Sequence, residues 1–156
     1  MRGKRAPKRL ITADAKYGSP IVAKLINSVM SDGKKSVATQ VVYGALEHVQ
    51  ETTKSDPVEI LNTAIKNVSP SLEVRSRRVG GANYQVPIPV RGERRLALAF
   101  RWLIAGAKAK KARPMSLKLG DELIAASNNE GDAVKKKMDV QRMAEANRAF
   151  AHFARF

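Results

Sequence analysis

Six arginines in the middle of the chain could bind phosphate groups. They stand in two groups of three on either side of a short apolar segment: Arg75, Arg77 and Arg78, then Arg91, Arg94 and Arg95. A guanidinium group is planar and permanently charged, so it can donate two parallel hydrogen bonds to a phosphate or stack on a base. Only two carboxylates, Glu73 and Glu93, lie within residues 73–95. This imbalance predicts a surface that an anion completes, most simply a nucleic acid.

A β-hairpin is the element expected to position these arginines. Two β-prone runs flank Gly80 and Gly81, the kind of pair that forms tight hairpin turns. Pro87 and Pro89 stand two apart, so their missing N–H groups lie on one side of the strand, which must face away from the partner strand. We predict a two-stranded ribbon over residues 72–91 with a blunted outer edge. A solvated hairpin is the alternative, but an isolated ribbon is only marginally stable.

The turn of the hairpin combines small residues with one nearby aromatic side chain. Gly80 and Gly81 would let the backbone approach a nucleic-acid strand closely. Tyr84 could stack on a base, as aromatic side chains do in proteins that bind single strands. Packing the root of the ribbon against the helical bundle is an equally good role for Tyr84.

The composition points to a polyanionic partner for the whole chain. Its 156 residues, enough for one domain, include 29 Lys and Arg against 14 Asp and Glu, a net charge of +15. An anionic membrane surface fits less well, because the basic residues are not confined to one amphipathic helix. The longest apolar run, residues 96–107, is too short to span a bilayer and contains Arg101. The absence of cysteine excludes disulfides and thiolate metal sites, and the start of the chain lacks the apolar core of a secretory signal.

Helical periodicity accounts for most of the remaining sequence. The first expected helix begins at Pro20 after the cap Ser19 and ends at Gly33, the second runs from Ser36 to Thr53, and the third begins at Pro57 after the cap Asp56 and stops at Pro70. The fourth covers residues 96–107, the fifth follows Pro114, and the sixth follows Gly131 and extends as far as Phe150. The fold class expected is mainly α: a six-helix bundle in a single domain, residues 1–156, with one protruding two-stranded antiparallel β-ribbon between the third and fourth helices. The aromatic residues Phe153 and Phe156 could fold back on the bundle.

Further basic residues are expected to extend the nucleic-acid surface. Residues 1–18 are expected to form a basic arm that orders on nucleic acid, with a merely solubilising tail as the alternative. The sequence Gly33-Lys34-Lys35-Ser36 is not a nucleotide phosphate loop, because Ser28 stands where the first glycine would be required. The additional candidate contacts are Arg2, Lys4, Arg5, Lys8, Arg9, Lys34, Lys35, Arg101, Lys108, Lys110, Lys111 and Arg113.

Residues suited to catalysis or metal binding are sparse. His48 and His152 have no second ligand at metal-binding spacing. Asp121 and Glu122 are adjacent, so they point to different faces of a helix and make a poor catalytic pair. We therefore expect no enzyme, no metal and no cofactor. An RNA-modifying enzyme would need a catalytic constellation that the sequence does not supply. A DNA-bending protein with a ribbon arm is the other alternative, although such arms usually carry proline at the tip.

Long sequence motifs resemble those of one family. The run EVRSRRVGGANYQVP at residues 73–87 is similar to the signature of the bacterial small-subunit ribosomal protein seven family. Four further segments share the resemblance: DGKK at 32–35, ALA with RWL at 97–103, AVKKK at 133–137 and RMAEANRA at 142–149. The similarity runs almost from end to end.

The resemblance implies a structural protein that binds the three-prime major domain of small-subunit ribosomal RNA and nucleates assembly of the subunit head. It also implies that the ribbon tip lies at the exit tRNA site near messenger RNA, through Val79, Gly80, Gly81, Ala82 and Asn83. Small-subunit ribosomal proteins nine and eleven are the implied neighbours. The ribosome of the cytoplasm, or of an organellar matrix, is the implied location.

Overall fold

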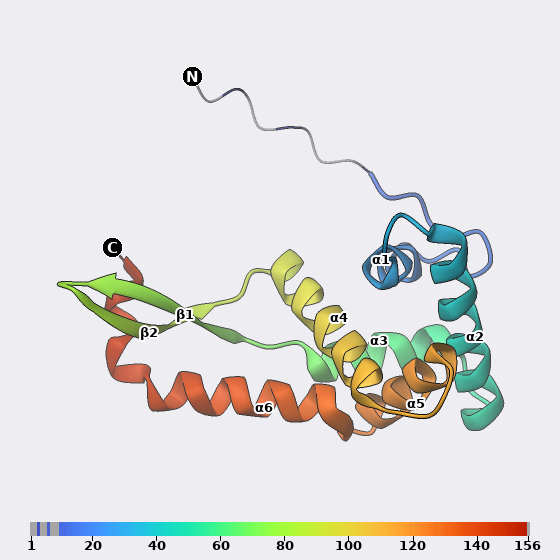
Figure 1. The fold of residues 1–156 in the computed structure, drawn as a ribbon. Coiled ribbons are helices and arrows are strands. Elements are labelled where there is room, and N and C mark those ends of the chain that lie inside the picture. Colours follow the sequence, from blue (N-terminus) through green and yellow to red (C-terminus); the bar gives the residue numbers. More distant parts are fainter. Residues whose placement is uncertain (1–2, 4–5, 7–9, 156) are drawn as a thin grey trace.

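The computed structural model describes residues 3, 6 and 10–155. Along the chain, the elements are α1 (Pro20–Val29), α2 (Lys35–Thr53), α3 (Pro57–Val68), β1 (Leu72–Val79), β2 (Ala82–Pro89), α4 (Gly92–Ala109), α5 (Met115–Ser127), α6 (Gly131–Ala146) and the 3-10 helix η1 (Arg148–Arg155). The mainly helical fold with one ribbon between the third and fourth helices is confirmed (Figure 1). The arm cations expected to bind nucleic acid lie outside the described residues: Arg2, Lys4, Arg5, Lys8 and Arg9.

The core is built from the first five helices, each of which buries leucine completely. The fully buried leucines include Leu25 of α1, Leu46 of α2, Leu61 of α3, Leu103 of α4 and Leu123 of α5. Each contributes about 1.5–3 kcal/mol relative to an exposed side chain. The apolar spacing that predicts these helices therefore also predicts the faces that meet.

Local signals at the helix ends explain where the elements begin. The Asp56 carboxylate accepts a hydrogen bond from the Val58 N–H at 3.0 Å, and Pro57 is the first residue of α3. This pair confirms the predicted start. The first helix ends at Val29 rather than Gly33, because Met30 already turns to extended backbone with ψ at 134°. Gly33, with φ at +73°, instead lies in the link to α2.

The ribbon has the predicted hairpin geometry. Gly80 and Gly81 have φ values of +57° and +92° and form a two-residue turn, for which positive φ at both central positions matches the strand twist. Val90 N–H donates to the Ser71 carbonyl at 3.0 Å. Because backbone direction alternates along a strand, the nitrogens of Pro87 and Pro89 face away from β1. The outward placement of both prolines is therefore confirmed.

The chain ends differently from the sequence expectation. The sixth helix was expected to carry Phe150, but α6 ends at Ala146, where the Asn147 side-chain amide donates to the Met143 carbonyl at 2.8 Å. Such local bonds compete with helix continuation. The chain then continues as η1, which packs on β2, while α6 runs beside the ribbon (Figure 1). Phe153 thus folds onto the ribbon rather than the bundle, and Phe156 lies outside the described residues.

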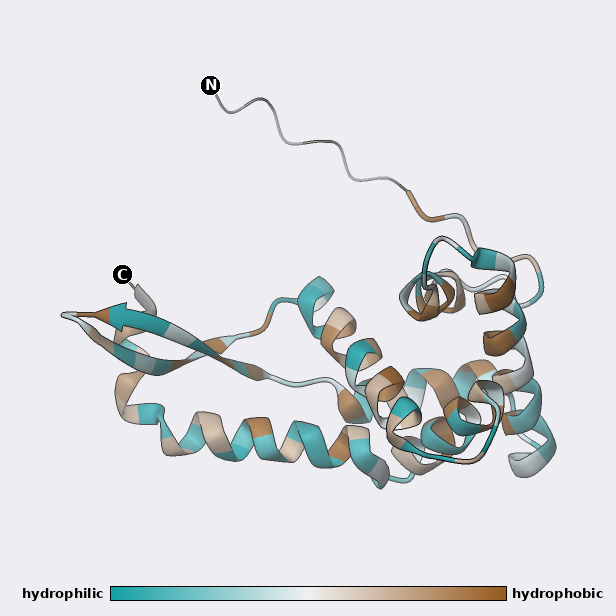
Figure 2. Cartoon of the chain, viewed as in Figure 1, coloured by the Kyte–Doolittle hydropathy of each residue, from teal (hydrophilic) through white to brown (hydrophobic). Residues whose placement is uncertain are grey.

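The distribution of hydrophobic residues distinguishes the helical bundle from the ribbon and α6. Hydrophobic residues concentrate where the helices of the bundle meet, and much of the ribbon and of α6 is hydrophilic (Figure 2). Among the described helices, none has both the length and the apolar character needed to cross a bilayer.

Candidate nucleic-acid interface

The three arginines of β1 do not share one face of the ribbon. Arg75 and Arg77 alternate with Ser76, so they lie on the face that also carries Glu73, and Arg78 lies on the opposite face. Arg77 Nη1 donates to the Phe153 carbonyl at 3.4 Å, a long hydrogen bond. The ribbon therefore presents cations in two directions.

A buried carboxylate ties the ribbon to α4. Glu73 accepts hydrogen bonds from Arg75 Nε at 2.8 Å and from Arg94 Nε at 3.1 Å. Burial by itself raises the pKa of Glu73, but the hydrogen bonds and charges of Arg94 and Arg75 outweigh it, so the pKa is lowered. Two of the six arginines singled out in the sequence, Arg75 and Arg94, thus have a carboxylate partner within the protein. Sequence spacing gave no sign of this cluster, because Arg94 is 21 residues away from Glu73.

Tyr84 packs within the chain itself. Its ring centroid lies 5.1 Å from that of Phe150 and 5.2 Å from that of Phe153, at tilted angles that suit aromatic pairs. These contacts hold η1 against the ribbon. Base stacking by Tyr84 stays a prediction. Of its two suggested roles, the structure supplies contacts for packing, with η1 rather than the bundle as the partner.

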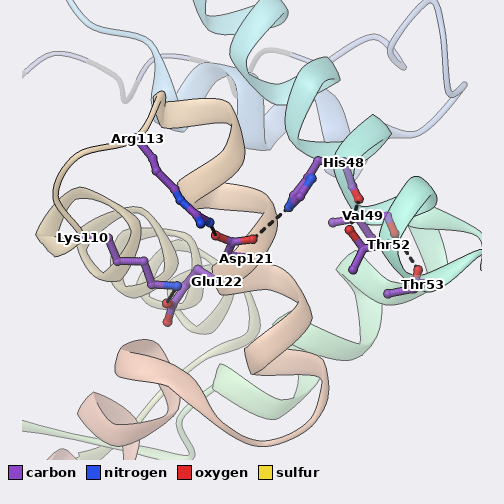
Figure 3. A network of polar contacts seen from close by, with 8 residues as sticks. All are labelled: His48, Val49, Thr52, Thr53, Lys110, Arg113, Asp121 and Glu122. Carbon is purple, nitrogen blue, oxygen red and sulfur yellow. Dashed lines mark hydrogen bonds and ion pairs between the residues drawn. The ribbon is translucent and has the colours of Figure 1, made fainter.

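The second buried carboxylate, Glu122, was missed as a partner of Lys110. Lys110 Nζ lies 2.9 Å from Glu122 Oε2 (Figure 3). The Ala133 N–H donates to Glu122 Oε1 at 2.9 Å. The approach of Lys110 is an ion pair rather than an aligned hydrogen bond. Space for the carboxylate comes from Gly106 and Gly131, where an added Cβ would lie 2.9 Å from Oε1. Sequence spacing does not indicate this site, because packing brings Gly106 and Gly131 to Glu122.

Asp121 points away from Glu122 and joins α5 to α2 and to the segment that precedes α5. It pairs with His48 Nε2 at 2.8 Å and with Arg113 Nη1 at 3.2 Å (Figure 3). The two adjacent carboxylates therefore lie on different sides of α5, as the sequence predicts. In the part of the chain that the structure describes, no three His, Cys, Asp or Glu side chains are grouped to hold a metal ion.

The remaining candidate cations are exposed and have no ion pair among the described residues. They belong to the α1–α2 link, the ribbon, α4 and the segment after it: Lys34, Lys35, Arg78, Arg91, Arg95, Arg101, Lys108 and Lys111. Helix α4 lies between the ribbon and α1 (Figure 1), so it can connect the cations of both. Lys34 and Lys108 line one hollow, and Lys108 and Arg101 line the next. This series can bind several phosphates of one polyanion.

The segment before α1 is anchored to α2. Tyr43 Oη donates to the Asp14 carboxylate at 2.9 Å, and Asp14 also accepts from the backbone N–H groups of Lys16 and Tyr17. Lys16 pairs with Glu47, and this hydrogen bond raises the pKa of Lys16. Residues 14–18, expected to belong to the basic arm, are therefore part of the folded domain.

Comparison with known proteins agrees with this description. The family model described as "Ribosomal protein S7p/S5e" matches residues 1–148. The chain is 59% identical over 153 residues to "Small ribosomal subunit protein uS7" of Thermotoga maritima, covering 98% of this chain and 99% of that protein. It is 55% identical over 152 residues to the protein of that name from Azorhizobium caulinodans, covering 97% of each.

Proposed function

We propose a specific RNA-binding role for this chain, which belongs to the ribosomal protein S7p/S5e family. Membership makes it a protein of the small ribosomal subunit that binds RNA and contributes to translation, in a family of structural proteins rather than enzymes. Beyond that, the chain binds the three-prime major domain of small-subunit ribosomal RNA and nucleates assembly of the subunit head.

The observation that carries this proposal is the series of exposed cations from the α1–α2 link across α4 to the ribbon. Lys34, Lys108 and Arg101 line neighbouring hollows, and Arg91 and Arg95 continue the series toward the ribbon. Within the described residues none is neutralised by a carboxylate. Folded RNA offers phosphates and splayed bases along such a path, whereas a regular duplex offers mainly shape and phosphate.

The ribbon tip is proposed to lie at the exit tRNA site near messenger RNA. Its residues are exposed, and an added Cβ at Gly80 or Gly81 would meet no atom within 4 Å. The backbone of the tip is therefore open to a nucleic-acid strand. Small-subunit ribosomal proteins nine and eleven are the proposed protein neighbours, and the ribosome of the cytoplasm or an organellar matrix is the proposed location.

Competition binding tests the proposal. A folded transcript of the three-prime major domain should displace labelled RNA far better than a transcript of another ribosomal domain or duplex DNA. If about six phosphates are neutralised, affinity should fall by roughly three orders of magnitude between about 50 and 200 mM salt. Equal competition by duplex DNA would favour the DNA-bending alternative, and a flat salt response would remove the electrostatic mechanism.

A further inference from the structure

A hollow lies between α1 and α4, beside two cations of the series described above, and charge alone does not account for its apolar lining. It has a volume of about 420 Å³; its floor includes Phe100 and Ile104, which are 3% and 8% exposed, and the exposed residues Ala97 and Ala105 supply the rest of its apolar lining. Two exposed cations, Arg101 and Lys108, stand on its rim. Ser28 of α1 forms the opposite wall. An apolar floor with a charged rim suits a ligand that has both apolar and anionic parts.

The spacing of residues on α4 creates this hollow. Ala97, Arg101, Ala105 and Lys108 succeed one another at helical intervals of three or four residues and so share one stripe. Ala105 leaves room between the long side chains of Arg101 and Lys108, and Ala97 leaves room on the other side of Arg101. Arg101 and Lys108 are seven residues apart, about 10.5 Å along the axis. Phosphates bound at these two positions would flank whatever enters the space between them.

We propose that this hollow receives the base of one unpaired nucleotide of the bound RNA, with its flanking phosphates on Arg101 and Lys108. The inference rests on the proposed function and deepens it, because it assigns a base-recognition position to a surface otherwise described only by charge. The charges on the rim favour a nucleotide over an apolar protein segment, since such a segment would bury both cations without a partner.

Ser28 adds a polar group at the wall. Its hydroxyl donates to the Lys24 carbonyl at 2.9 Å. A hydroxyl oxygen retains acceptor capacity after donating, so it can accept a hydrogen bond from an N–H of a base. The hollow thus offers an apolar surface for the flat face of a base and one polar atom for its edge.

Filling the hollow without changing charge is the direct test. Ala105→Leu leaves both cations in place, and Ala109→Leu is its matched control, because Ala109 is exposed on the same helix and does not line the hollow. The probe is a folded transcript of the three-prime major domain, with affinity measured over a series of salt concentrations. Ala105→Leu should weaken binding at least about fivefold, the low end for losing one stacked base.

The salt dependence separates base from phosphate recognition. Ala105→Leu should keep the wild-type slope of log affinity against log salt, while Arg101→Gln should reduce that slope by about one. Base-specific chemical probes should then find one unpaired nucleotide that the wild-type protein shields and the saturated Ala105→Leu complex exposes. Unchanged affinity in Ala105→Leu, or identical footprints, would overturn the inference. If the wild type itself does not select the transcript, the proposed function fails instead.

Discussion

Lys110 Nζ lies 2.9 Å from Oε2 of Glu122, a residue with 0% of its surface exposed. The pair joins the end of α4 to α5, and the Ala133 N–H extends the connection to the first turn of α6. The charge of Lys110 is therefore already matched inside the protein. Its removal should change stability more than RNA affinity, although the sequence suggests an RNA contact.

We expect Glu122→Gln to destabilise the fold by about 1.5–3 kcal/mol, because the contact with Lys110 is lost while the Lys110 side chain, 34% exposed, stays partly hydrated. Urea unfolding of the free protein measures this loss. Asp139→Asn is the control, since Asp139 and Arg142 form an exposed pair 3.9 Å apart and such pairs contribute about 1 kcal/mol at most. Lys110→Met should cost at least as much, about 3 kcal/mol, because it leaves the fully buried Glu122 carboxylate without its cation. Equal stability of the Glu122 and Asp139 variants would contradict the assignment.

The Glu73 cluster should make the ribbon–α4 junction sensitive to acid. The pKa of Glu73 is lowered from its usual 4.5, because Arg94 and Arg75 outweigh the opposing effect of burial. A lowered folded-state pKa means that the stabilisation is fully present above the unfolded value and is lost as pH falls through the folded value. Unfolding midpoints of the wild type and Glu73→Gln should differ at neutral pH and converge in acid. Arg94→Met should show a smaller pH dependence than the wild type, and a wild-type profile for this variant would exclude Arg94 as a main cause.

The aromatic contacts of Tyr84 should stiffen the ribbon in the absence of RNA. Tyr84→Ala removes its contacts with Phe150 and Phe153, and aromatic pairs contribute about 0.5–1.5 kcal/mol each beyond area burial. We expect faster amide exchange in β2 of the free protein, with exchange in α2 unchanged. Phe153→Ala should have the same effect. If Tyr84→Ala changes only RNA binding, its main role is base stacking.

Arg78 should contribute to RNA binding and not to the stability of the fold. It is exposed on the opposite ribbon face from Glu73 and has no ion pair among the described residues. Arg78→Ala should weaken transcript binding and reduce the salt slope by about one, with unchanged helical content and melting temperature. Arg75→Ala is the informative comparison, because it also removes a hydrogen bond to Glu73. Loss of helical content in Arg78→Ala would mean that the arginine is structural.

Structural features that depend on neighbouring residues could be predicted from the sequence. Asp56 followed by Pro57 predicts the start of α3, and Pro87 with Pro89 predicts the direction of the ribbon's outer edge. Each depends on backbone constraints that act within a few residues. The family resemblance adds the function, which no local rule supplies.

Ion pairs between side chains that are distant in the sequence could not be predicted in the same way. Glu73 meets Arg94 and Glu122 meets Lys110 only because separate elements pack together. A row of arginines in a sequence therefore does not reveal which guanidinium groups are already engaged. The position of η1 depends likewise on Tyr84 of a distant strand.

The anchorage of the ribbon at Glu73 also controls how accurately its far end is placed. Each strand has eight residues. At about 3.3 Å per residue the hairpin is a lever roughly 26 Å long, so a rotation of about 5° at its base would move the glycine turn by about 2 Å. Such a displacement exceeds the tolerance of a hydrogen bond. The contact between Glu73 and Arg94 at the base, together with α6 and η1 packed along the ribbon, therefore limits the displacement of the glycine turn.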